Sequence, residues 1–84
     1  MGPAVLLTVY STPWCGHCTR LKRQIECAGL AYVDIDIEAD PDAERLVRTV
    51  NGGSATVPVV ALPGGQALPN PSLAEVLEAL GTAA

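Results

Sequence analysis

Two cysteines at C-x-x-C spacing, Cys15 and Cys18, are the residues of this sequence best suited to covalent chemistry. They follow an apolar run and precede an amphipathic one, so the pair is expected where a strand gives way to a helix. The first turn of a helix directs unpaired backbone N–H groups and the positive end of the helix dipole toward a sulfur placed there. That environment favours the thiolate, which is the form of cysteine that attacks a disulfide. The spacing therefore indicates thiol–disulfide exchange, with the two cysteines close enough to form a disulfide with each other.

Two neighbours of the cysteines can take part in the same chemistry. Trp14 is the single tryptophan of a chain without phenylalanine, and we expect it to form an apolar rim against which a substrate packs; the alternative is that it fills the core. His17 falls inside the first helical turn, where an imidazole can stabilise the thiolate and make the disulfide more oxidising. The alternative for His17 is a partly exposed turn residue without an energetic role.

A C-x-x-C pair can also be half of a zinc site, which needs two further ligands. The candidates nearby are His17 and Cys27, and helical geometry turns Cys27 about 120° away from Cys15. Haem attachment requires a histidine directly after the second cysteine, and this sequence has Thr19 there. We therefore expect no metal, and we expect Cys27 to be a bystander thiol on the outer face of the helix.

The segment Thr56-Val57-Pro58 is the second informative stretch. A proline just ahead of a strand and after a β-branched residue is a candidate for a cis peptide bond. A cis bond would turn the backbone N–H and C=O of Val57 toward an incoming extended thiol, which could then pair in the manner of an added strand.

The hydrophobic pattern predicts seven elements in the order βαβαββα. Strands are expected at residues 5–10, 31–37, 58–62 and 66–68, and helices at about 15–28, at 41–50 and from 73 onward. Local signals mark the helix ends: a Schellman stop at Gly29 and Leu30, an N-cap at Asp40, and a capping box formed by Ser72 and Glu75. Apolar stripes at helical spacing should face the core, namely Cys18, Leu21, Ile25 and Ala28, then Ala43, Leu46, Val47 and Val50, then Leu73, Val76, Leu77 and Leu80.

Length and composition narrow the class of protein. The 84 residues, 49% hydrophobic and 17% charged, predict one ordered domain spanning 1–84. Because the net charge is −4 we expect no nucleic-acid partner, and from the pattern of the first residues we expect no signal peptide or membrane span. Three cysteines, two of them in one C-x-x-C, fit a reducing cytoplasm, and we expect a monomer. All five basic residues fall in the first two predicted helices, where they could hold the carboxylate of a small thiol or simply form solvated faces.

Taken together, these stretches resemble the glutaredoxins. The resemblance rests on the C-x-x-C after the first strand and on Thr56-Val57-Pro58 before the third. Within that group, Trp14-Cys15-Gly16-x-Cys18, Val50-Asn51-Gly52-Gly53 and Asn70-Pro71-Ser72 are similar to the actinobacterial mycoredoxins. The resemblance spans almost the whole chain and implies an α/β thioredoxin-like fold of the glutaredoxin type, a mixed four-stranded sheet flanked by three helices.

The same resemblance implies an activity. It implies removal of mycothiol from mixed disulfides on proteins, with mycothiol as co-substrate and no tightly bound cofactor. By this analogy Cys15 is the attacking thiolate and Cys18 the second thiol. The residues that would bind the small thiol or the substrate are Trp14, His17, Thr56, Val57, Pro58, Asn70 and Ser72. The partners implied are mycothiol or a similar small thiol and S-thiolated or disulfide-containing proteins.

Departures from the usual glutaredoxin pattern leave alternatives open. Glutaredoxins usually carry Cys-Pro-Tyr-Cys with a lysine shortly upstream and a Gly-Gly-x-Asp segment near the last helix. Here Ser11-Thr12 and Asn70-Pro71-Ser72 stand at those places, which weakens the case for glutathione. Cys15-Gly16-His17-Cys18 also matches the protein disulfide isomerases, whose length and signal peptide are missing here. A dithiol electron donor, for example to ribonucleotide reductase, and an iron–sulfur cluster carrier are the other functions considered.

Overall fold

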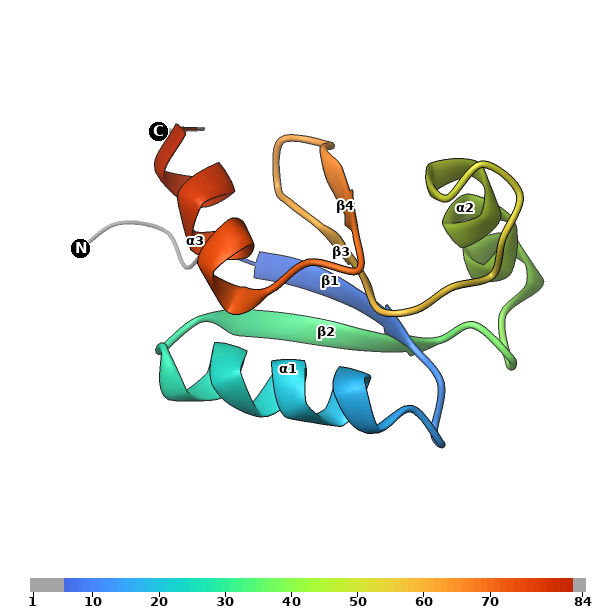
Figure 1. Ribbon diagram of the computed structural model, residues 1–84, viewed down its shortest axis with the longest axis horizontal. Helices are drawn as coiled ribbons and strands as arrows, with labels where there is room; N and C mark the ends of the chain where they lie inside the picture. Colours follow the sequence, from blue (N-terminus) through green and yellow to red (C-terminus); the bar gives the residue numbers. More distant parts are fainter. Residues whose placement is uncertain (1–5, 83–84) are drawn as a thin grey trace.

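The structure, a computed structural model, describes residues 6–82 and contains the seven elements in the predicted order (Figure 1). The elements are β1 (Leu6–Ser11), α1 (Gly16–Cys27), β2 (Ala31–Asp36), α2 (Pro41–Val50), β3 (Val59–Ala61), β4 (Ala67–Pro69) and α3 (Leu73–Thr82). The first strand was expected to include Val5, which lies outside the described residues. No helix within residues 6–82 is long and apolar enough to cross a membrane.

The four strands form one mixed sheet in the order β2-β1-β3-β4. β1 runs parallel to β2, with α1 as the crossover between them, and antiparallel to β3. β3 and β4 are antiparallel and joined by a tight turn, in which the N–H of Gly65 donates to the C=O of Leu62 at 3.0 Å. Gly65 has a φ of +98°, a conformation that glycine adopts without steric cost. The predicted thioredoxin-like fold is confirmed.

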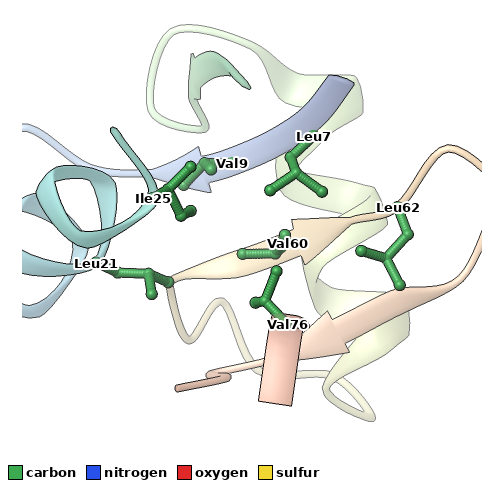
Figure 2. Close-up of a cluster of buried hydrophobic side chains, with 7 residues drawn as sticks. All are labelled: Leu7, Val9, Leu21, Ile25, Val60, Leu62 and Val76. Carbon is green, nitrogen blue, oxygen red and sulfur yellow. The ribbon is translucent and has the colours of Figure 1, made fainter. Parts of the chain in front are cut away.

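One face of the sheet carries the main hydrophobic core, which α1 and α3 cover. Side chains alternate along a strand, so Leu7 and Val9 of β1 point to the same face. The cluster consists of Leu7, Val9, Leu21, Ile25, Val60, Leu62 and Val76, drawn from two strands, two helices and the residue after β3 (Figure 2). Fully burying each of these side chains stabilises the fold by about 1.5–3 kcal/mol.

The opposite face of the sheet is covered by α2. Its buried residues Ala43 and Val47 pack with Ile37 and Val59 in a second, smaller cluster. The sheet therefore lies between α2 on one side and α1 with α3 on the other. In this arrangement the loop that precedes α1, the segment from β2 to α2 and the loop that precedes β3 lie at one end of the sheet.

The start and the end of α1 are both set by local sequence. Cys15 is the N-cap, with extended backbone angles. At the other end the N–H of Leu30 donates to the C=O of Ile25 at 3.2 Å, and the N–H of Gly29 donates to the C=O of Glu26 at 3.0 Å. Gly29 has a φ of +79°. These are the two bonds of a Schellman motif, so the predicted helix stop is confirmed.

Three residues of the predicted apolar stripes do not reach the core. Ala28, Leu46 and Leu77 are exposed, whereas the other predicted stripe residues are buried or half-buried. Ala28 is the C-cap of α1 and lies beyond its last turn. Leu46 and Leu77 lie at the margins of their stripes, and β4, the strand that α2 contacts, has only three residues, which is little surface for a wide stripe on α2. The strand boundaries also shift by one residue: β1 ends one residue later and β2 one residue earlier than predicted, β3 is one residue shorter at each end, and β4 begins and ends one residue later.

Candidate active site

Cys15 lies at the very start of α1, and its sulfur acts as the capping group. The backbone N–H of Cys18 donates to Cys15 Sγ at 3.1 Å, so that sulfur occupies the place that a serine or aspartate oxygen takes in an ordinary N-cap. The N–H of Cys15 itself donates to the C=O of Thr12 at 3.3 Å, which ties the preceding loop to the helix. The hydrogen bond from the Cys18 N–H stabilises negative charge on Cys15 Sγ. Because Cys15 is partly exposed, the sulfur can also be reached by a disulfide from outside.

Cys18 differs from Cys15 although it is only one helical turn away. Its side chain is fully buried, on the same stripe as Leu21 and Ile25. Burial raises the pKa of the Cys18 thiol to about 12, and the hydrogen bond with Cys15 adds to the rise, while the Thr12 backbone and the charge of Lys22 act in the opposite direction. Both cysteines are free thiols in this structure. Cys18 is therefore a shielded, protonated thiol beside an accessible sulfur.

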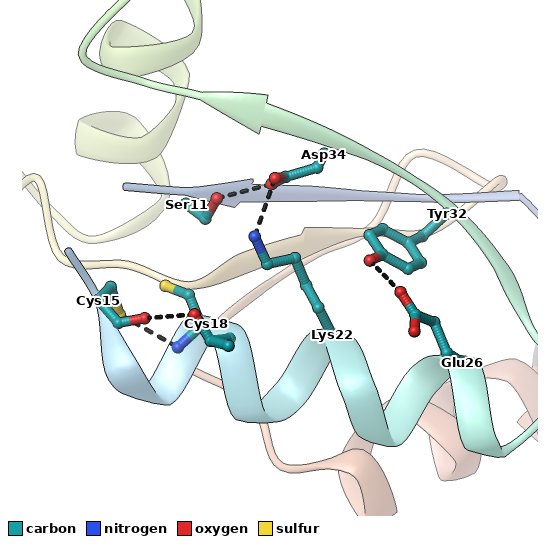
Figure 3. Close-up of polar contacts among 8 residues, drawn as sticks. Ser11, Cys15, Cys18, Lys22, Glu26, Tyr32 and Asp34 are labelled. Carbon is teal, nitrogen blue, oxygen red and sulfur yellow. Dashed lines mark hydrogen bonds and ion pairs between the residues drawn. The ribbon is translucent and has the colours of Figure 1, made fainter. Parts of the chain in front are cut away.

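A polar network lies on the same side of α1, four residues beyond Cys18 (Figure 3). Lys22 Nζ contacts Asp34 Oδ2 of β2 at 2.9 Å, and Ser11 Oγ donates to Asp34 Oδ1 at 2.6 Å. Partial burial alone would raise the pKa of the Asp34 carboxyl, but the hydrogen bonds from Lys22 and Ser11 outweigh it and hold that pKa below its usual range. Sequence reasoning missed this network. The available signal was that Lys22 lies four residues after Cys18, which places both on the same face of the helix.

Trp14 and His17, the two predicted neighbours of the cysteines, are both on the surface. The indole of Trp14 is 72% exposed, which rules out the alternative that it fills the core. Its Nε1–H donates to Glu38 Oε2 at 2.8 Å, across the gap between the loop before α1 and the segment after β2. His17 is exposed in the first turn of α1.

The Val57–Pro58 peptide bond is cis, as the sequence predicted. The loop around it is held from two directions. Asn51 Nδ2, at the end of α2, donates to the C=O of Thr56 at 2.9 Å. From the other side, the N–H of Asn70 donates to the C=O of Pro58 at 2.8 Å. The structure thus brings Asn70 to the predicted proline loop.

Ser72 has a task of its own at the start of α3. Its Oγ accepts the N–H of Glu75 at 3.1 Å, and its N–H donates to Glu75 Oε1 at 2.8 Å. This is the predicted capping box. The Ser72 hydroxyl, which the resemblance assigned to thiol binding, is therefore engaged in starting the helix.

A cavity of about 230 Å³ joins the loop before α1 to the loop before β3. Its walls are formed by Thr12, Trp14, Ile37, Glu38, Glu44 and Ala55, and Ala55 directly precedes Thr56-Val57-Pro58. Sequence reasoning missed the two glutamates, because they come from segments more than 20 residues away from Cys15 along the chain. The basic residues form no part of these walls.

The basic residues and the third cysteine lie elsewhere. Arg45 and Arg48 form ion pairs with acidic residues of α2, which matches a solvated helix face. Lys22 is half-buried, with a side chain 20% exposed, and pairs with Asp34. Cys27 is exposed at the last residue of α1, roughly 13 Å along the helix from Cys18. Among residues 6–82, no group of three or more histidine, cysteine, aspartate or glutamate residues comes together in a way that could hold a metal ion.

Comparisons with known proteins agree with this geometry. The sequence model of the glutaredoxin family matches residues 7–67. A Mycobacterium tuberculosis protein named as a glutaredoxin is 47% identical over 70 residues, which are 83% of each chain. Mycoredoxin 1 of Corynebacterium glutamicum is 37% identical over 71 residues, covering 84% of this chain and 87% of that protein. The solved structure of NrdH-redoxin from Escherichia coli superposes with a TM-score of 0.64 at 26% identity, covering 76% of this chain and 80% of that one. That protein is described as glutaredoxin-like, with a thioredoxin-like activity profile.

Proposed function

This chain belongs to the glutaredoxin family of thiol–disulfide oxidoreductases, and on that premise we propose that it removes mycothiol from mixed disulfides on proteins through Cys15. The observation that carries the proposal is the sulfur of Cys15 at the N-cap of α1, partly exposed and hydrogen-bonded by the Cys18 N–H at 3.1 Å. An accessible sulfur with stabilised negative charge is the nucleophile that disulfide exchange requires.

The proposed cycle has two exchange steps. In the first, the Cys15 thiolate attacks the mycothiol sulfur of a protein mixed disulfide; the S–S bond to the protein breaks, and the protein leaves as a thiolate that takes up a proton. In the second, the thiolate of a second mycothiol attacks the mycothiol sulfur bound to Cys15. That step forms mycothiol disulfide and returns Cys15 as a thiolate. In sum, one mixed disulfide and one free mycothiol give one protein thiol and one mycothiol disulfide, so the number of disulfides does not change.

Support for mycothiol over glutathione comes from the residues near Cys15. Where glutaredoxins usually carry an upstream lysine, this chain has Ser11 and Thr12, and both are buried. The nearest lysine along the helix, Lys22, is engaged with Asp34 at 2.9 Å. The segment upstream of Cys15 therefore offers no lysine to the carboxylate of a thiol such as glutathione. The 37% identity to a protein named Mycoredoxin 1 supports the same choice.

A turnover assay with three electron sources tests the proposal. A model protein carrying a mycothiol or a glutathione mixed disulfide is supplied with mycothiol, with glutathione, or with thioredoxin reductase and NADPH, and the protein thiol released is measured over time. Mycothiol is expected to support reduction more than tenfold faster than glutathione at equal thiolate concentration, and Cys15→Ser should abolish it. Equal rates with mycothiol and glutathione would contradict the mycothiol assignment.

A second candidate function is that of a dithiol electron donor of the thioredoxin type. Its support is the structural similarity to NrdH-redoxin, with a TM-score of 0.64, together with the contact of the Cys18 N–H with Cys15 Sγ at 3.1 Å. Fast reduction by thioredoxin reductase, with slow reduction by both small thiols, would favour this function.

The cytoplasm is the compartment that we propose for either activity, because reduced thiols and small-thiol reductants belong to a reducing environment. We propose that the protein works as a monomer, since Cys15 and its surroundings are complete within one chain. Size-exclusion chromatography with light scattering under reducing conditions checks the monomer; a dimer that dissociates only with loss of turnover would contradict it.

A further inference from the structure

We propose that the cavity beside Cys15 is a subsite for an uncharged, hydroxyl-rich ring carried by the reacting thiol, and that its two glutamates disfavour thiols that end in a carboxylate. This inference rests on the proposed function, since it names the part of the small thiol that the site recognises. The cavity measures about 230 Å³ and its wall includes Thr12 and Trp14, which immediately precede Cys15. A cavity of about 150 Å³ holds a six-membered ring as large as benzene, so this one has room for a single hydroxylated six-membered ring.

One wall of the cavity is a flat aromatic surface. The Trp14 indole is 72% exposed, and its Nε1–H donates to Glu38 Oε2 at 2.8 Å. An indole anchored through its N–H presents a rigid apolar ring at little entropic cost. The C–H face of a sugar or cyclitol ring can pack against such a surface while its hydroxyls point elsewhere.

Two glutamates of the cavity wall, Glu38 and Glu44, supply acceptors for those hydroxyls. Glu38 uses Oε2 for the indole, and Glu44 uses Oε2 for Arg48, whose Nε and Nη2 lie at 3.0 and 2.9 Å. Within the described residues, Oε1 of each carboxylate remains available to an incoming O–H. Hydrogen bonds to a carboxylate are roughly twice as strong as those between neutral groups. The wall also contains Thr12, whose Oγ1 is the one buried side-chain polar atom in residues 6–82 without a hydrogen-bond partner.

The charges around the cavity favour an uncharged ligand. The charge of Glu44 is compensated by Arg48, and Glu38 is bound only to the neutral indole, so the cavity keeps one net negative charge. A carboxylate that enters meets a like charge at close range, which is unfavourable. A hydroxyl-rich ring meets two acceptors and no repulsion. A cationic ligand would meet the single net charge, and the test below includes it.

The test compares how one substitution changes the reaction with thiols of different charge. Glu38→Gln removes the charge and keeps an oxygen that can accept the Trp14 N–H. The rate constant for reduction of a model disulfide by the whole protein is measured with each of four thiols as reductant. Mycothiol is neutral and hydroxyl-rich, glutathione carries a net negative charge, and glutathione diethyl ester has the length of glutathione but a net positive charge. The fourth thiol, 2-mercaptoethanol, is too short to reach the cavity. Taking the ratio of variant to wild type for each thiol cancels differences in thiol ionisation.

We expect Glu38→Gln to raise the rate with glutathione three- to tenfold, to lower the rate with mycothiol at least threefold, and to leave 2-mercaptoethanol within twofold. Glu44→Gln, which leaves Arg48 uncompensated, should raise the glutathione rate further. The matched control is Asp42→Asn, the same loss of charge on the same helix but outside the cavity; it should change none of the ratios more than twofold. As a second readout, binding of each S-methyl thiol is followed by Trp14 fluorescence, and the dissociation constant should be lower for S-methyl mycothiol than for S-methyl glutathione.

The outcomes separate this inference from the proposed function. If wild type uses mycothiol and glutathione equally, the proposed function fails. If wild type prefers mycothiol but Glu38→Gln and Glu44→Gln both leave that preference unchanged, the subsite inference alone is overturned. A loss of rate with glutathione diethyl ester larger than the loss with mycothiol would also overturn it, because the cavity would then be a cation site.

Discussion

The buried thiol of Cys18 controls how fast a mixed disulfide on Cys15 can collapse into the intramolecular disulfide. In that step the Cys18 sulfur attacks Cys15 and expels the small thiol, and only the Cys18 thiolate can do so. Burial raises the pKa of this thiol from 9.0 to about 12. At pH 7 an ordinary thiol is about 1% ionised, whereas Cys18 is ionised in about one molecule in 100,000, so its thiolate is about a thousandfold scarcer.

A thiolate of higher pKa is also a better nucleophile, which compensates in part. With a Brønsted coefficient of about 0.4–0.5, three pKa units raise the intrinsic reactivity about 15- to 30-fold. The net result is ring closure about 30- to 60-fold slower than with an ordinary thiol. This is an upper limit, because the contribution of Cys15 to the pKa of Cys18 disappears once Cys15 is in a mixed disulfide.

We therefore predict that mixed-disulfide reduction runs mainly through Cys15 alone. Cys18→Ala, which avoids a buried hydroxyl, should keep at least half of the wild-type turnover with a small thiol, whereas Cys15→Ser should keep none. In the wild type, release of the small thiol from a preformed Cys15 mixed disulfide, followed by mass spectrometry without added thiol, should accelerate about tenfold per pH unit between pH 7 and 9. A release rate independent of pH, or a Cys18→Ala variant as inactive as Cys15→Ser, would refute the reasoning.

Three further predictions concern other parts of the molecule. The pKa of Asp34 is lowered in the folded state, so its contribution to stability is present above its ordinary pKa and is lost as the pH falls through the folded value. Urea unfolding between pH 2 and 4 should therefore show a smaller loss of stability with acid for Asp34→Asn than for the wild type. The difference should be less than about 1 kcal/mol, because the pair with Lys22 is partly exposed. Ser72→Ala should lower the free energy of unfolding by about 1 kcal/mol through loss of the cap and leave turnover unchanged; lost turnover with unchanged stability would instead assign Ser72 to thiol binding. Trp14 fluorescence should fall when the two active-site cysteines form a disulfide, and an emission that is the same in both redox states would contradict this.

The sequence predicted the helix ends well because each is fixed by neighbouring residues. Asp40 caps α2 by accepting the N–H groups of Asp42 and Ala43, and the capping box at α3 joins residues only three positions apart. Such bonds depend on a few consecutive residues, so they can be inferred without the rest of the chain. The cis bond before Pro58 was only a candidate from the sequence, because most X–Pro bonds are trans, and its loop is held by Asn51 and by the distant Asn70.

Features that join distant segments could not be predicted in this way. The contact between Trp14 and Glu38 spans 24 residues, and the one between Ser11 and Asp34 spans 23. Both depend on where β2 is placed relative to β1, and a shift of one residue in that register would turn Asp34 to the other face of the sheet. The exposure of Leu46 likewise depends on the small area that β3 and β4 offer beneath α2. The hydrophobic pattern of α2 carries no information about that area.

The difference between the two cysteines follows from a single piece of local geometry. Residues three apart at a helix start lie on one side of the helix, so the spacing that brings the Cys18 N–H to within 3.1 Å of Cys15 Sγ also places the Cys18 side chain on the stripe of Leu21 and Ile25. That stripe packs against the sheet, and Cys18 is buried with it. Cys15, as the N-cap, stands before the first turn and stays partly exposed. The same helix start thus stabilises charge on one sulfur and suppresses it on the other, and no residue beyond the C-x-x-C and the apolar stripe is needed to set the two thiols apart.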